Sequence, residues 1–370
     1  MSGLELRHVR KAFGAHEVFP DLSLEVEHGE HVAIFGPSGC GKTLLLRLIA
    51  GIYDPDAGDI LMDGRSILDL APDRRGIGMA FQNFALYPHM SAFDNIASPL
   101  SAHGNSAPTE HVREIAGLLK IDHVLSHAPR ALSNGQKQRT ALARALVGEP
   151  KLLLLDDPLR NVDAKLRYEM RLELPKLLRG FDATVLYVTQ DYKEAMALGH
   201  RIAVMSRGTI RQFGTPEEIY YQPADVEIAR LFGDPTINLL QLQPEKNEGG
   251  VHIRLSEVAV PLPGGDTLPT GRECTVGLRP EVLAFVDADV PAAIPVTVEA
   301  ETPLNEKVVS LVRTSCGHEL LVSRPAGTPA PASGPAHIGV DPGRLLLFDP
   351  SSGDRIALQD AVSTRGGSTT

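Results

Sequence analysis

Cysteine is scarce in this chain. Its 370 residues hold only Cys40, Cys274 and Cys316, and these lie far apart. They do not have the spacing of a metal site, and an odd number argues against a disulfide framework. We therefore expect a reducing compartment, the cytoplasm. We interpret Cys40 as a small loop residue rather than as a nucleophile.

The chain also has no long hydrophobic run and no excess of positive charge. No stretch approaches the roughly 18 apolar residues that a membrane span needs. The first residues, MSGLELRHVRKAF, lack the apolar segment of a secretory signal. Lys and Arg number 36 against 46 Asp and Glu, which gives a net charge of −10. This charge argues against non-specific binding to nucleic acid or to an anionic membrane surface. If the protein works at a membrane, its partners must supply the spans.

The arrangement of apolar segments predicts an α/β domain followed by an all-β domain. Hydrophobic residues make up 43% of the chain, which is ample for buried cores. Residues 1–30 alternate as antiparallel strands do, and residues 88–150 are mostly helical in pattern. Buried strands such as HVAIF and KLLLLD alternate with helices, which predicts a mainly parallel, doubly wound sheet. After about residue 235 the chain becomes rich in Gly and Pro, with short strands typical of a small barrel or sandwich. We expect domains at 1–235 and 236–360, and a disordered tail at 361–370.

A glycine-rich loop, GPSGCGKT, lies between a predicted strand and a predicted helix. It matches the pattern G-x-x-x-x-G-K-[ST], and this context is the one that the phosphate-binding motif requires. The glycines let backbone N–H groups surround a β-phosphate, while Lys42 neutralises the β- and γ-phosphates and Thr43 offers a hydroxyl to Mg²⁺. ATP and Mg²⁺ are the expected cofactors. The expected nucleotide contacts in this loop are Gly36, Ser38, Gly39, Cys40, Gly41, Lys42 and Thr43.

Two further segments carry polar residues of the expected site. The apolar run KLLLLDDP ends in Asp156, which would hold Mg²⁺ through water, and Asp157, which should position and deprotonate the attacking water. In ALSNGQKQRTALARAL, Ser133 and Gly135 precede a long helix that begins near Gln136. A serine and backbone N–H groups at a helix start make an anion site. The alternative for this segment is an ordinary capped surface helix.

Together these motifs resemble the ATP-binding subunits of ABC transporters, with LSNGQ where the family has LSGGQ. The resemblance covers nearly the whole chain. It implies that Phe13 stacks on adenine, that Gln82 reaches Mg²⁺ and links to membrane subunits, and that Asp163 belongs to the loop that crosses between subunits. It also implies that Ser133, Gly135 and Gln136 contact ATP bound by the facing subunit. The alternatives are a core aromatic for Phe13 and a surface turn for the loop residues.

A subfamily also shows in the sequence. QNFALYPHMSAFDNI and QPADVEIARLFGDPTINLL resemble segments of importer subunits for carbohydrates, polyols and related solutes. GLRPEVL and GRLLLFDPSSGDRI resemble the C-terminal domain of that group, which has OB-like β-folds and serves in regulation, as a dimer clamp, or both. The resemblance implies transmembrane permease subunits as partners, an extracellular or periplasmic solute-binding protein, and a peripheral location on the cytoplasmic face of the plasma membrane.

Two positions depart from the family pattern. Asp157 stands where the family has a catalytic glutamate, and Gln190 stands where it has a histidine that senses the γ-phosphate. Glutamine can hydrogen-bond a phosphate but cannot carry the charge of an imidazolium. The chain is therefore expected to be an ATPase that binds ATP well and hydrolyses it weakly at its own site. A smaller departure is Leu44, which replaces a second hydroxyl residue.

Three functions remain open at this point. In the first, the chain is the hydrolysis-weak half of a heterodimer with a second, complete ATP-binding subunit, and it donates LSNGQ to the partner's site. In the second, it forms an active homodimer in a sugar importer. In the third, it senses ATP outside transport. A soluble ATPase of this family acting on ribosomes or DNA is disfavoured by the charge and by the lack of a second cassette or a long coiled coil.

Overall fold

The computed structural model describes residues 2–102, 109–160, 164–181, 183–248, 250–265 and 271–358. The predicted tail at 361–370 and the candidate site residue Asp163 lie outside these described residues. The chain divides into two compact units, Met1–Pro216 and Glu217–Thr370, each of which is described by itself. Among the described residues, no helix has the length and apolar character that crossing a membrane requires.

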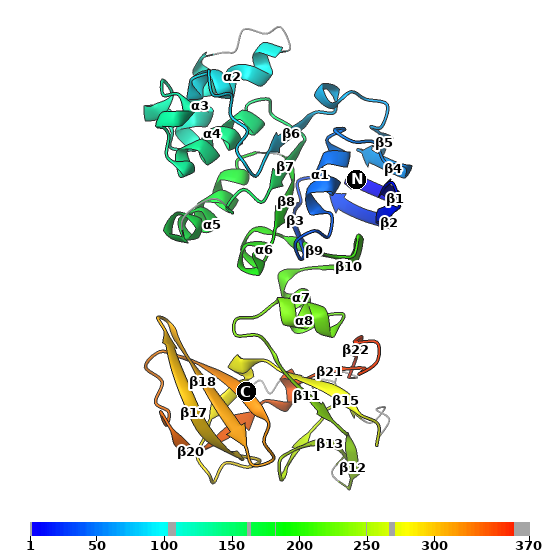
Figure 1. Ribbon diagram of the computed structural model, residues 1–370, viewed down its shortest axis with the longest axis vertical. Helices are drawn as coiled ribbons and strands as arrows, with labels where there is room; N and C mark the ends of the chain where they lie inside the picture. The colour runs from blue at the N-terminus through cyan, green and yellow to red at the C-terminus, as the bar shows by residue number, and fades with distance from the viewer. Residues whose placement is uncertain are drawn as a thin grey trace, which may run out of the picture. The chain divides into compact units, whose positions relative to one another are not determined.

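A six-stranded sheet forms the centre of the first unit (Figure 1). Its order is β10–β9–β3–β8–β7–β6, and every pairing is parallel except the edge pair of β9 and β10. The predicted mainly parallel sheet is thereby confirmed. The strands are β3 (His31–Phe35), β6 (Ile77–Ala80), β7 (Leu152–Asp156), β8 (Thr184–Thr189), β9 (Arg201–Ser206) and β10 (Thr209–Gly214).

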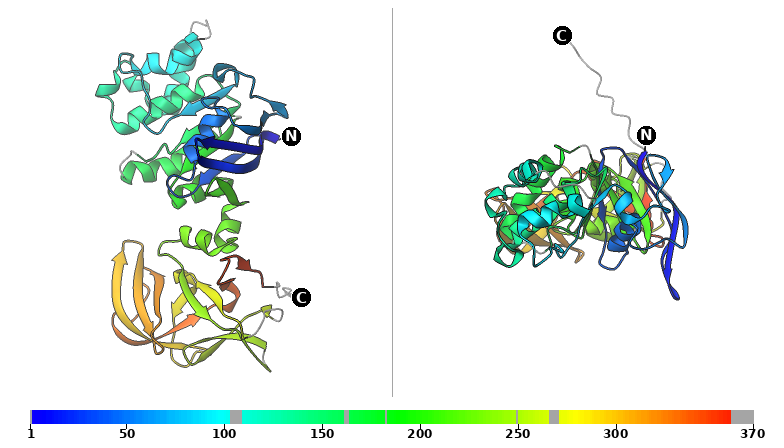
Figure 2. Two further views of the ribbon diagram at one scale, coloured as in Figure 1. Left: turned by 45° about the vertical axis from the view of Figure 1, so that its right-hand side comes forward. Right: turned by 90° about the horizontal axis from the view of Figure 1, so that it is seen from above.

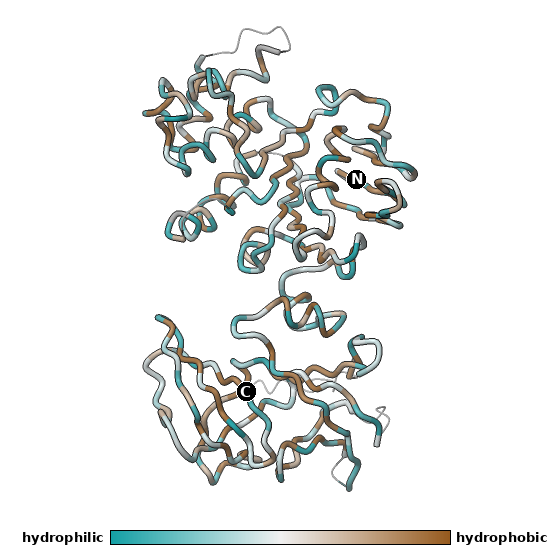
Figure 3. Tube along the Cα trace, viewed as in Figure 1, coloured by the Kyte–Doolittle hydropathy of each residue, from teal (hydrophilic) through white to brown (hydrophobic). Residues whose placement is uncertain are grey.

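Alternate residues of the central strands enter two different cores. On β7, Leu153 and Leu155 pack with the helices of one face, whereas Leu152 and Leu154 pack with α1 and the antiparallel strands of the other. Successive side chains of a strand point to opposite faces, so a strand covered on both sides must be apolar throughout. The uninterrupted LLLL therefore fits a central strand, and Figure 3 shows apolar residues following the strands of this sheet.

An antiparallel sheet of order β2–β1–β4–β5 lies beside α1 (Figure 2). Its strands come from the segment in which the sequence predicted antiparallel structure and from the turn-rich segment that follows α1. Leu4, Leu6 and Val9 of β1 are buried in the same core as α1. The strands are β1 (Ser2–Phe13), β2 (His16–Glu27), β4 (Ala57–Met62) and β5 (Arg65–Ser66).

Helices and short 3₁₀ turns cover the central sheet. The predicted helical stretch at 88–150 contains α2, α3 and α4 in its described part, and these pack together with α5 around one core. Helix α4 begins at Asn134, two residues earlier than expected. The elements are α1 (Lys42–Ile49), α2 (Ala92–Ala102), α3 (Thr109–Leu118), α4 (Asn134–Leu146), α5 (Ala164–Leu178), α6 (Tyr192–Leu198), η1 (Pro72–Arg74), η2 (Asp122–Val124) and η3 (Pro129–Ala131).

The second unit is almost entirely antiparallel β-structure in its described residues. Its three sheets have the orders β11–β15–β21–β22, β12–β13–β14 and β16–β20–β17–β18–β19. The strands are β11 (Asn238–Leu242), β12 (Glu245–Asn247), β13 (Gly250–Leu255), β14 (Val258–Pro261), β15 (Cys274–Leu278), β16 (Leu283–Phe285), β17 (Ile294–Leu304), β18 (Lys307–Thr314), β19 (Glu319–Pro325), β20 (Gly334–Val340), β21 (Leu346–Phe348) and β22 (Arg355–Ile356), with η5 (Pro280–Val282) and η6 (Pro342–Arg344) between them.

Helices α7 (Pro216–Tyr221) and α8 (Val226–Leu231) pack with the β-structure of the second unit. Arg279 is buried there, donates hydrogen bonds to the carbonyl oxygens of Phe232 and Tyr220, and lies 3.6 Å from the centroid of the Tyr220 ring. These bonds hold both helices to the residue that directly follows β15. The division between the units falls between Pro216 and Glu217, at the start of α7, whereas composition indicated a boundary near residue 235.

Candidate functional site

The glycine-rich loop joins β3 to α1 at the carboxyl edge of the parallel sheet. Gly41 has a φ of 105°, and a Cβ there would lie 2.5 Å from Cε1 of Phe19. At Gly36 a Cβ would lie 2.1 Å from the carbonyl oxygen of Met205. Both positions therefore require glycine, one for the left-handed backbone and close packing and the other for close packing alone. The loop can approach a phosphate closely because no side chain stands in the way.

Lys42 is poised over this loop. Its side chain is 5% exposed, and its Nζ donates hydrogen bonds to the carbonyl oxygens of Gly36 at 2.7 Å and Pro37 at 2.8 Å. Burial lowers the pKa of Lys42. An ammonium has three donors: two bond the loop carbonyls, and the third makes a long contact with the Cys40 thiol that a phosphate oxygen can replace. Cys40, as expected, is a buried loop residue, with its Sγ 3.8 Å from Nζ.

Thr43 and Asp156 form the expected metal position. Thr43 Oγ1 donates a hydrogen bond to Asp156 Oδ1 at 2.9 Å, and Asp156 is buried at the end of β7. Because the hydroxyl hydrogen points to the carboxylate, the lone pairs of the hydroxyl oxygen remain available to coordinate a cation. Hydroxyl and carboxylate oxygens are the donors that Mg²⁺ prefers. These two residues therefore fit Mg²⁺.

Asp157 follows β7 directly, and a backbone hydrogen bond to β8 fixes its position. Its N–H donates to the carbonyl oxygen of Val188 on β8 at 2.9 Å, and its φ is 45°. Non-glycine residues rarely adopt a positive φ, and when they do the strain often marks a functional position. The side chain is buried, which raises the pKa of Asp157, while Arg160 counters this with Nη1 3.7 Å from Oδ2.

Gln190 opens onto the same hollow as Asp157. That hollow is lined by Asp157, Arg160, Arg167, Gln190, Asp191, Tyr192, Lys193 and Glu194. Because β7 and β8 pair in parallel, with Asp156 opposite Val188, the residues that follow the two strands come out at one edge. The structure thus brings together the two positions at which the sequence departs from the family pattern, one directly after β7 and the other directly after β8.

Gln82 lies in the loop that follows β6, and side chains of helices α2 and α4 hold this loop in place. Arg144 of α4 donates to the carbonyl oxygens of Ala85 at 2.8 Å and Phe84 at 3.0 Å. The amide of Asn95 on α2 is fully buried and bonds the backbone of Tyr87, Met90 and Ser91. The loop is therefore built into the helical segment, and Gln82 is half-buried within it.

The LSNGQ segment has the local structure of a capped helix. Ser133 Oγ accepts from the N–H of Gln136 at 3.2 Å, and Gln136 Oε1 accepts from the N–H of Ser133 at 2.9 Å. This reciprocal pair fixes the start of α4. It uses a lone pair of the serine oxygen, so the serine O–H can still donate to an anion. Ser133 is exposed and Gly135 is buried.

Phe13 stands at the end of β1. Its side chain is 47% exposed, which excludes the alternative of a core aromatic. The ring meets Tyr53 edge-on at 5.8 Å between centroids, and Lys11 Nζ lies 5.4 Å from its centroid. An exposed ring face is what stacking on a base requires. No position can be given for Asp163, because it lies outside the described residues.

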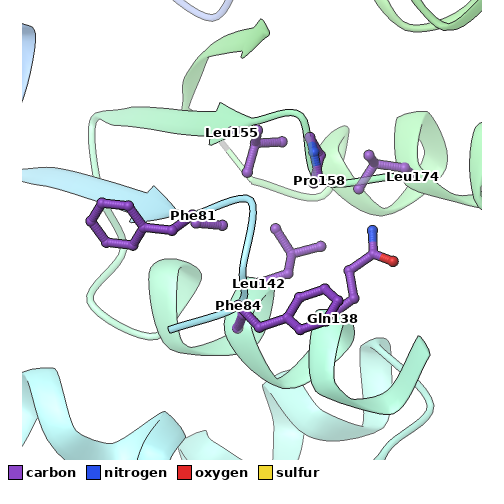
Figure 4. Close-up of a pocket in the computed structure, with 9 residues that line it drawn as sticks. Phe81, Phe84, Gln138, Leu142, Leu155, Pro158 and Leu174 are labelled. Atoms are coloured by element: carbon purple, nitrogen blue, oxygen red, sulfur yellow. The ribbon is translucent and has the colours of Figure 1, made fainter. Parts of the chain in front are cut away.

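A small apolar hollow lies beneath the Gln82 loop (Figure 4). In the figure, Phe84, Leu142, Gln138 and Leu155 border the hollow, whereas the ring of Phe81 lies to one side. Gln138 is buried, and its Oε1 has no hydrogen-bond partner among the described residues. The full lining is Ala80, Phe81, Phe84, Gln138, Ala141, Leu142, Leu155, Pro158 and Leu174. The hollow thus joins the loop to α4, α5 and the end of β7.

Several residues of the site region were not singled out from the sequence. Arg160 neighbours Asp157, Arg144 and Asn95 fix the Gln82 loop, and Arg171 and Glu194 flank Gln190. Arg160 stands three residues after Asp157 in the sequence DDPLR, so its charge beside the acidic pair was a visible signal. Arg144 and Arg171 act through contacts between residues 20 or more positions apart, and Asn95 and Glu194 act through burial; residue order shows neither.

The chain is similar to known proteins over nearly its whole length. The chain matches the family described as ABC transporter over residues 19–160. It is 40% identical over 363 residues to the sn-glycerol-3-phosphate import ATP-binding protein UgpC of Escherichia coli strain K12, a match that covers 96% of this chain and 100% of the relative. It is 41% identical over 368 residues to the protein of the same name in Salmonella typhi, with the same coverage.

Solved structures are similar to the first part of the chain. The ATP-binding cassette MJ0796, described as a dimer in a post-hydrolysis state bound to ADP and Pi, is 30% identical with a TM-score of 0.53. This similarity covers 58% of the present chain and 98% of the cassette. A second structure of the same cassette, described as dimeric, is 29% identical with the same TM-score and coverage.

Proposed function

This chain belongs to the ATP-binding proteins of ABC transporters, ATPases that drive transport, and from that premise we propose that it powers the import of a small solute through separate membrane subunits. The observation that carries the proposal is the convergence of Lys42, Thr43, Asp156, Asp157 and Gln190 at the carboxyl edge of one parallel sheet. Ligands of open α/β sheets bind at this edge. We propose a sugar, a polyol or a polyol phosphate as the solute, because the relatives over the full chain are named for sn-glycerol-3-phosphate import.

At the nucleotide site, each residue has a separate task. The loop amides and the start of α1 bind phosphate oxygens, and Lys42 turns its third donor from the Cys40 thiol to them. Thr43 and Asp156 hold Mg²⁺, which neutralises phosphate charge when bound, and Gln82 approaches it from the neighbouring loop. Asp157 orients a water and accepts its proton, while the Gln190 amide donates to the γ-phosphate. Phe13 stacks on the base, next to Tyr53.

The proposed partners complete the nucleotide site and supply the membrane-spanning parts of the transporter. A second ATP-binding subunit faces this one, as in the dimeric cassettes to which the chain is similar. Ser133, Gly135 and Gln136 of α4 would then face ATP on that subunit, and Asp163 would belong to the crossing loop. Permease subunits dock on the loop that follows Gln82 and hold the chain at the cytoplasmic face of the plasma membrane. A solute-binding protein delivers solute on the other side.

We propose further that the second subunit is a different protein with a complete catalytic set. The serine and glycine of LSNGQ are retained, while Asp157 and Gln190 weaken this chain's own site. An active homodimer is the alternative, because an aspartate can act as a base if its loop moves inward.

Native mass spectrometry of the transporter, purified through a tag on this chain, tests both statements. Recovery of permease subunits with this chain is expected, and their absence would overturn the transport proposal. One copy of this chain beside another ATPase supports the unequal pair, whereas two copies without another ATPase exclude it. Lys42→Ala is the companion variant, expected to weaken ATP binding to the purified chain while leaving its folding unchanged.

A further inference from the structure

The segment that carries Gln190 is fixed by a buried carboxylate four residues further on. Glu194 is 2% exposed. Its Oε2 accepts hydrogen bonds from the hydroxyls of Tyr187 at 2.9 Å and Thr189 at 2.8 Å. Thr189 Oγ1 in turn accepts from the N–H of Asp191 at 3.0 Å. Both neighbours of Gln190 are therefore tied, directly or through Thr189, to Glu194.

Arg171 of α5 closes this network from the neighbouring helix. It forms an ion pair with Asp191 and lies 3.9 Å from Oε1 of Glu194. Its side chain is 17% exposed, so these pairs are largely shielded from water. Asp191 also caps α6 by accepting from the N–H of Lys193 at 2.8 Å. Helices α5 and α6 lie side by side (Figure 1), and Arg171 joins them.

Burying the Glu194 carboxylate costs folding free energy, which suggests that this position has a role besides packing. A buried carboxylate loses its hydration, and burial raises the pKa of Glu194. An apolar residue would fill the space at lower cost. Gln190 itself is exposed on the hollow that also holds Asp157. Without packing around its side chain, its position depends on the backbone, which this network fixes.

We propose that Glu194 and Arg171 are positioning residues for Gln190: they hold its backbone where the amide meets the γ-phosphate, and they tie it to α5. This inference rests on the proposed function, in which Gln190 donates to that phosphate. Neither residue touches the nucleotide. Helix α5 follows the segment of Asp163, so a shift of that helix would move Gln190.

A double-mutant cycle between Glu194→Gln and Gln190→Ala tests the proposal. The glutamine at 194 keeps an oxygen that accepts from Tyr187 and Thr189 but removes the charge that faces Arg171. Single-turnover hydrolysis of ATP, with the full chain in excess, gives a maximal rate and a half-saturating concentration for each variant. Displacement of a catalytic group by about 1 Å costs up to about a hundredfold in rate. We expect Glu194→Gln to lower the maximal rate about tenfold, with half-saturation changed less than about threefold.

The cycle separates positioning from general damage. If Glu194 acts through Gln190, Glu194→Gln has no further effect once Gln190 is alanine, because coupled residues are not additive. Rate losses that multiply would overturn the inference while leaving the proposed function intact. A Gln190→Ala variant with unchanged hydrolysis would instead refute the γ-phosphate assignment itself. The two failures are therefore distinguishable.

Substitutions of Arg171, together with unfolding measurements, distinguish loss of positioning from loss of the fold. Arg171→Lys keeps the charge and should retain more activity than Arg171→Met, which removes it. Thermal unfolding of each variant identifies loss of the fold. Glu299→Gln, which breaks an exposed pair with Arg313 in the second unit, is the matched control and should leave hydrolysis unchanged. If Arg171→Met folds and hydrolyses ATP at the wild-type rate, the positioning pair does not exist.

Discussion

Thr43 and Asp156 are 113 positions apart in the chain, yet the hydroxyl of the first donates to the carboxylate of the second across 2.9 Å. One stands at the start of α1 and the other at the end of β7, and parallel strands bring both to one edge of the sheet. This contact places the glycine-rich loop next to an acidic strand end, and it defines the proposed Mg²⁺ position.

We predict that Mg²⁺-dependent ATP affinity depends on this pair. Thr43→Val removes the hydroxyl while keeping the shape, and Asp156→Asn removes the charge. Each should weaken Mg²⁺-ATP binding about tenfold or more, because a hydrogen bond to a charged group contributes about 1.5–3 kcal/mol. Isothermal titration with and without Mg²⁺ measures the effect. Thr43→Ser keeps the hydroxyl and is the control; equal affinity in all three variants would contradict the metal assignment.

Restoring the family residues should raise hydrolysis. Asp157→Glu extends the carboxylate by about one C–C bond, ~1.5 Å, and Gln190→His supplies a group that can carry charge. We expect each single variant to hydrolyse ATP faster and the double variant fastest, by about ten- to a hundredfold, since misplacement near 1 Å costs about that much. Steady-state phosphate release gives the rates. Asp349→Glu in the second unit is the control, and an unchanged rate in the double variant would show that these positions do not limit turnover.

Asn95 should be important for the loop that carries Gln82. Its amide bonds the backbone of Tyr87, Met90 and Ser91 at 2.7–3.3 Å while fully buried. Asn95→Ala leaves those groups without partners, which should lower the free energy of unfolding by about 2–4 kcal/mol. Urea unfolding followed by circular dichroism gives the value. The exposed Asn83 lies in the same loop, and Asn83→Ala should change stability by less than about 0.5 kcal/mol.

Stability should fall in mild acid because of the buried His31, which stacks on the exposed His200. The rings of His31 and His200 stack with centroids 4.6 Å apart, and His31 is 6% exposed. Burial, with His200 and Arg179 nearby, lowers the pKa of His31 from 6.5 to about 4. Between pH 6.5 and about 4, His31 is therefore protonated in the unfolded chain but neutral in the folded chain. Its contribution to the free energy of unfolding is complete above pH 6.5 and is lost as the pH falls toward 4.

The loss from His31 should approach about 3 kcal/mol at the acid end of that range. Chemical unfolding at several pH values, compared between the wild-type chain and His31→Gln, isolates this contribution from other titrating groups. The variant should show a flatter pH dependence. His16→Gln, at an exposed position, is the control. Parallel curves for the wild-type chain and His31→Gln would show that His31 titrates normally in the folded state.

The sequence by itself determined the motifs and the order of the elements. GPSGCGKT, the apolar run before Asp156, and LSNGQ each fix a local structure through residue type: glycines for a loop, leucines for a strand buried on both faces, serine for a helix cap. The expected parallel sheet, the all-β second part and the ABC family are confirmed for that reason. The functions of all the individual site residues, Lys42, Thr43, Asp156 and Asp157 included, and the OB-like nature of the second unit remain predictions.

Only the tertiary structure decided which distant residues meet. Parallel pairing of β7 with β8 brought Asp157 and Gln190 to one hollow, and α5 brought Arg171 to Asp191 and Glu194. It also assigned α7 and α8 to the second unit through the buried Arg279. Local patterns record hydrophobic period and capping, which depend on neighbours in sequence. Ion pairs and buried hydrogen bonds depend on neighbours in space, and only the folded chain defines those.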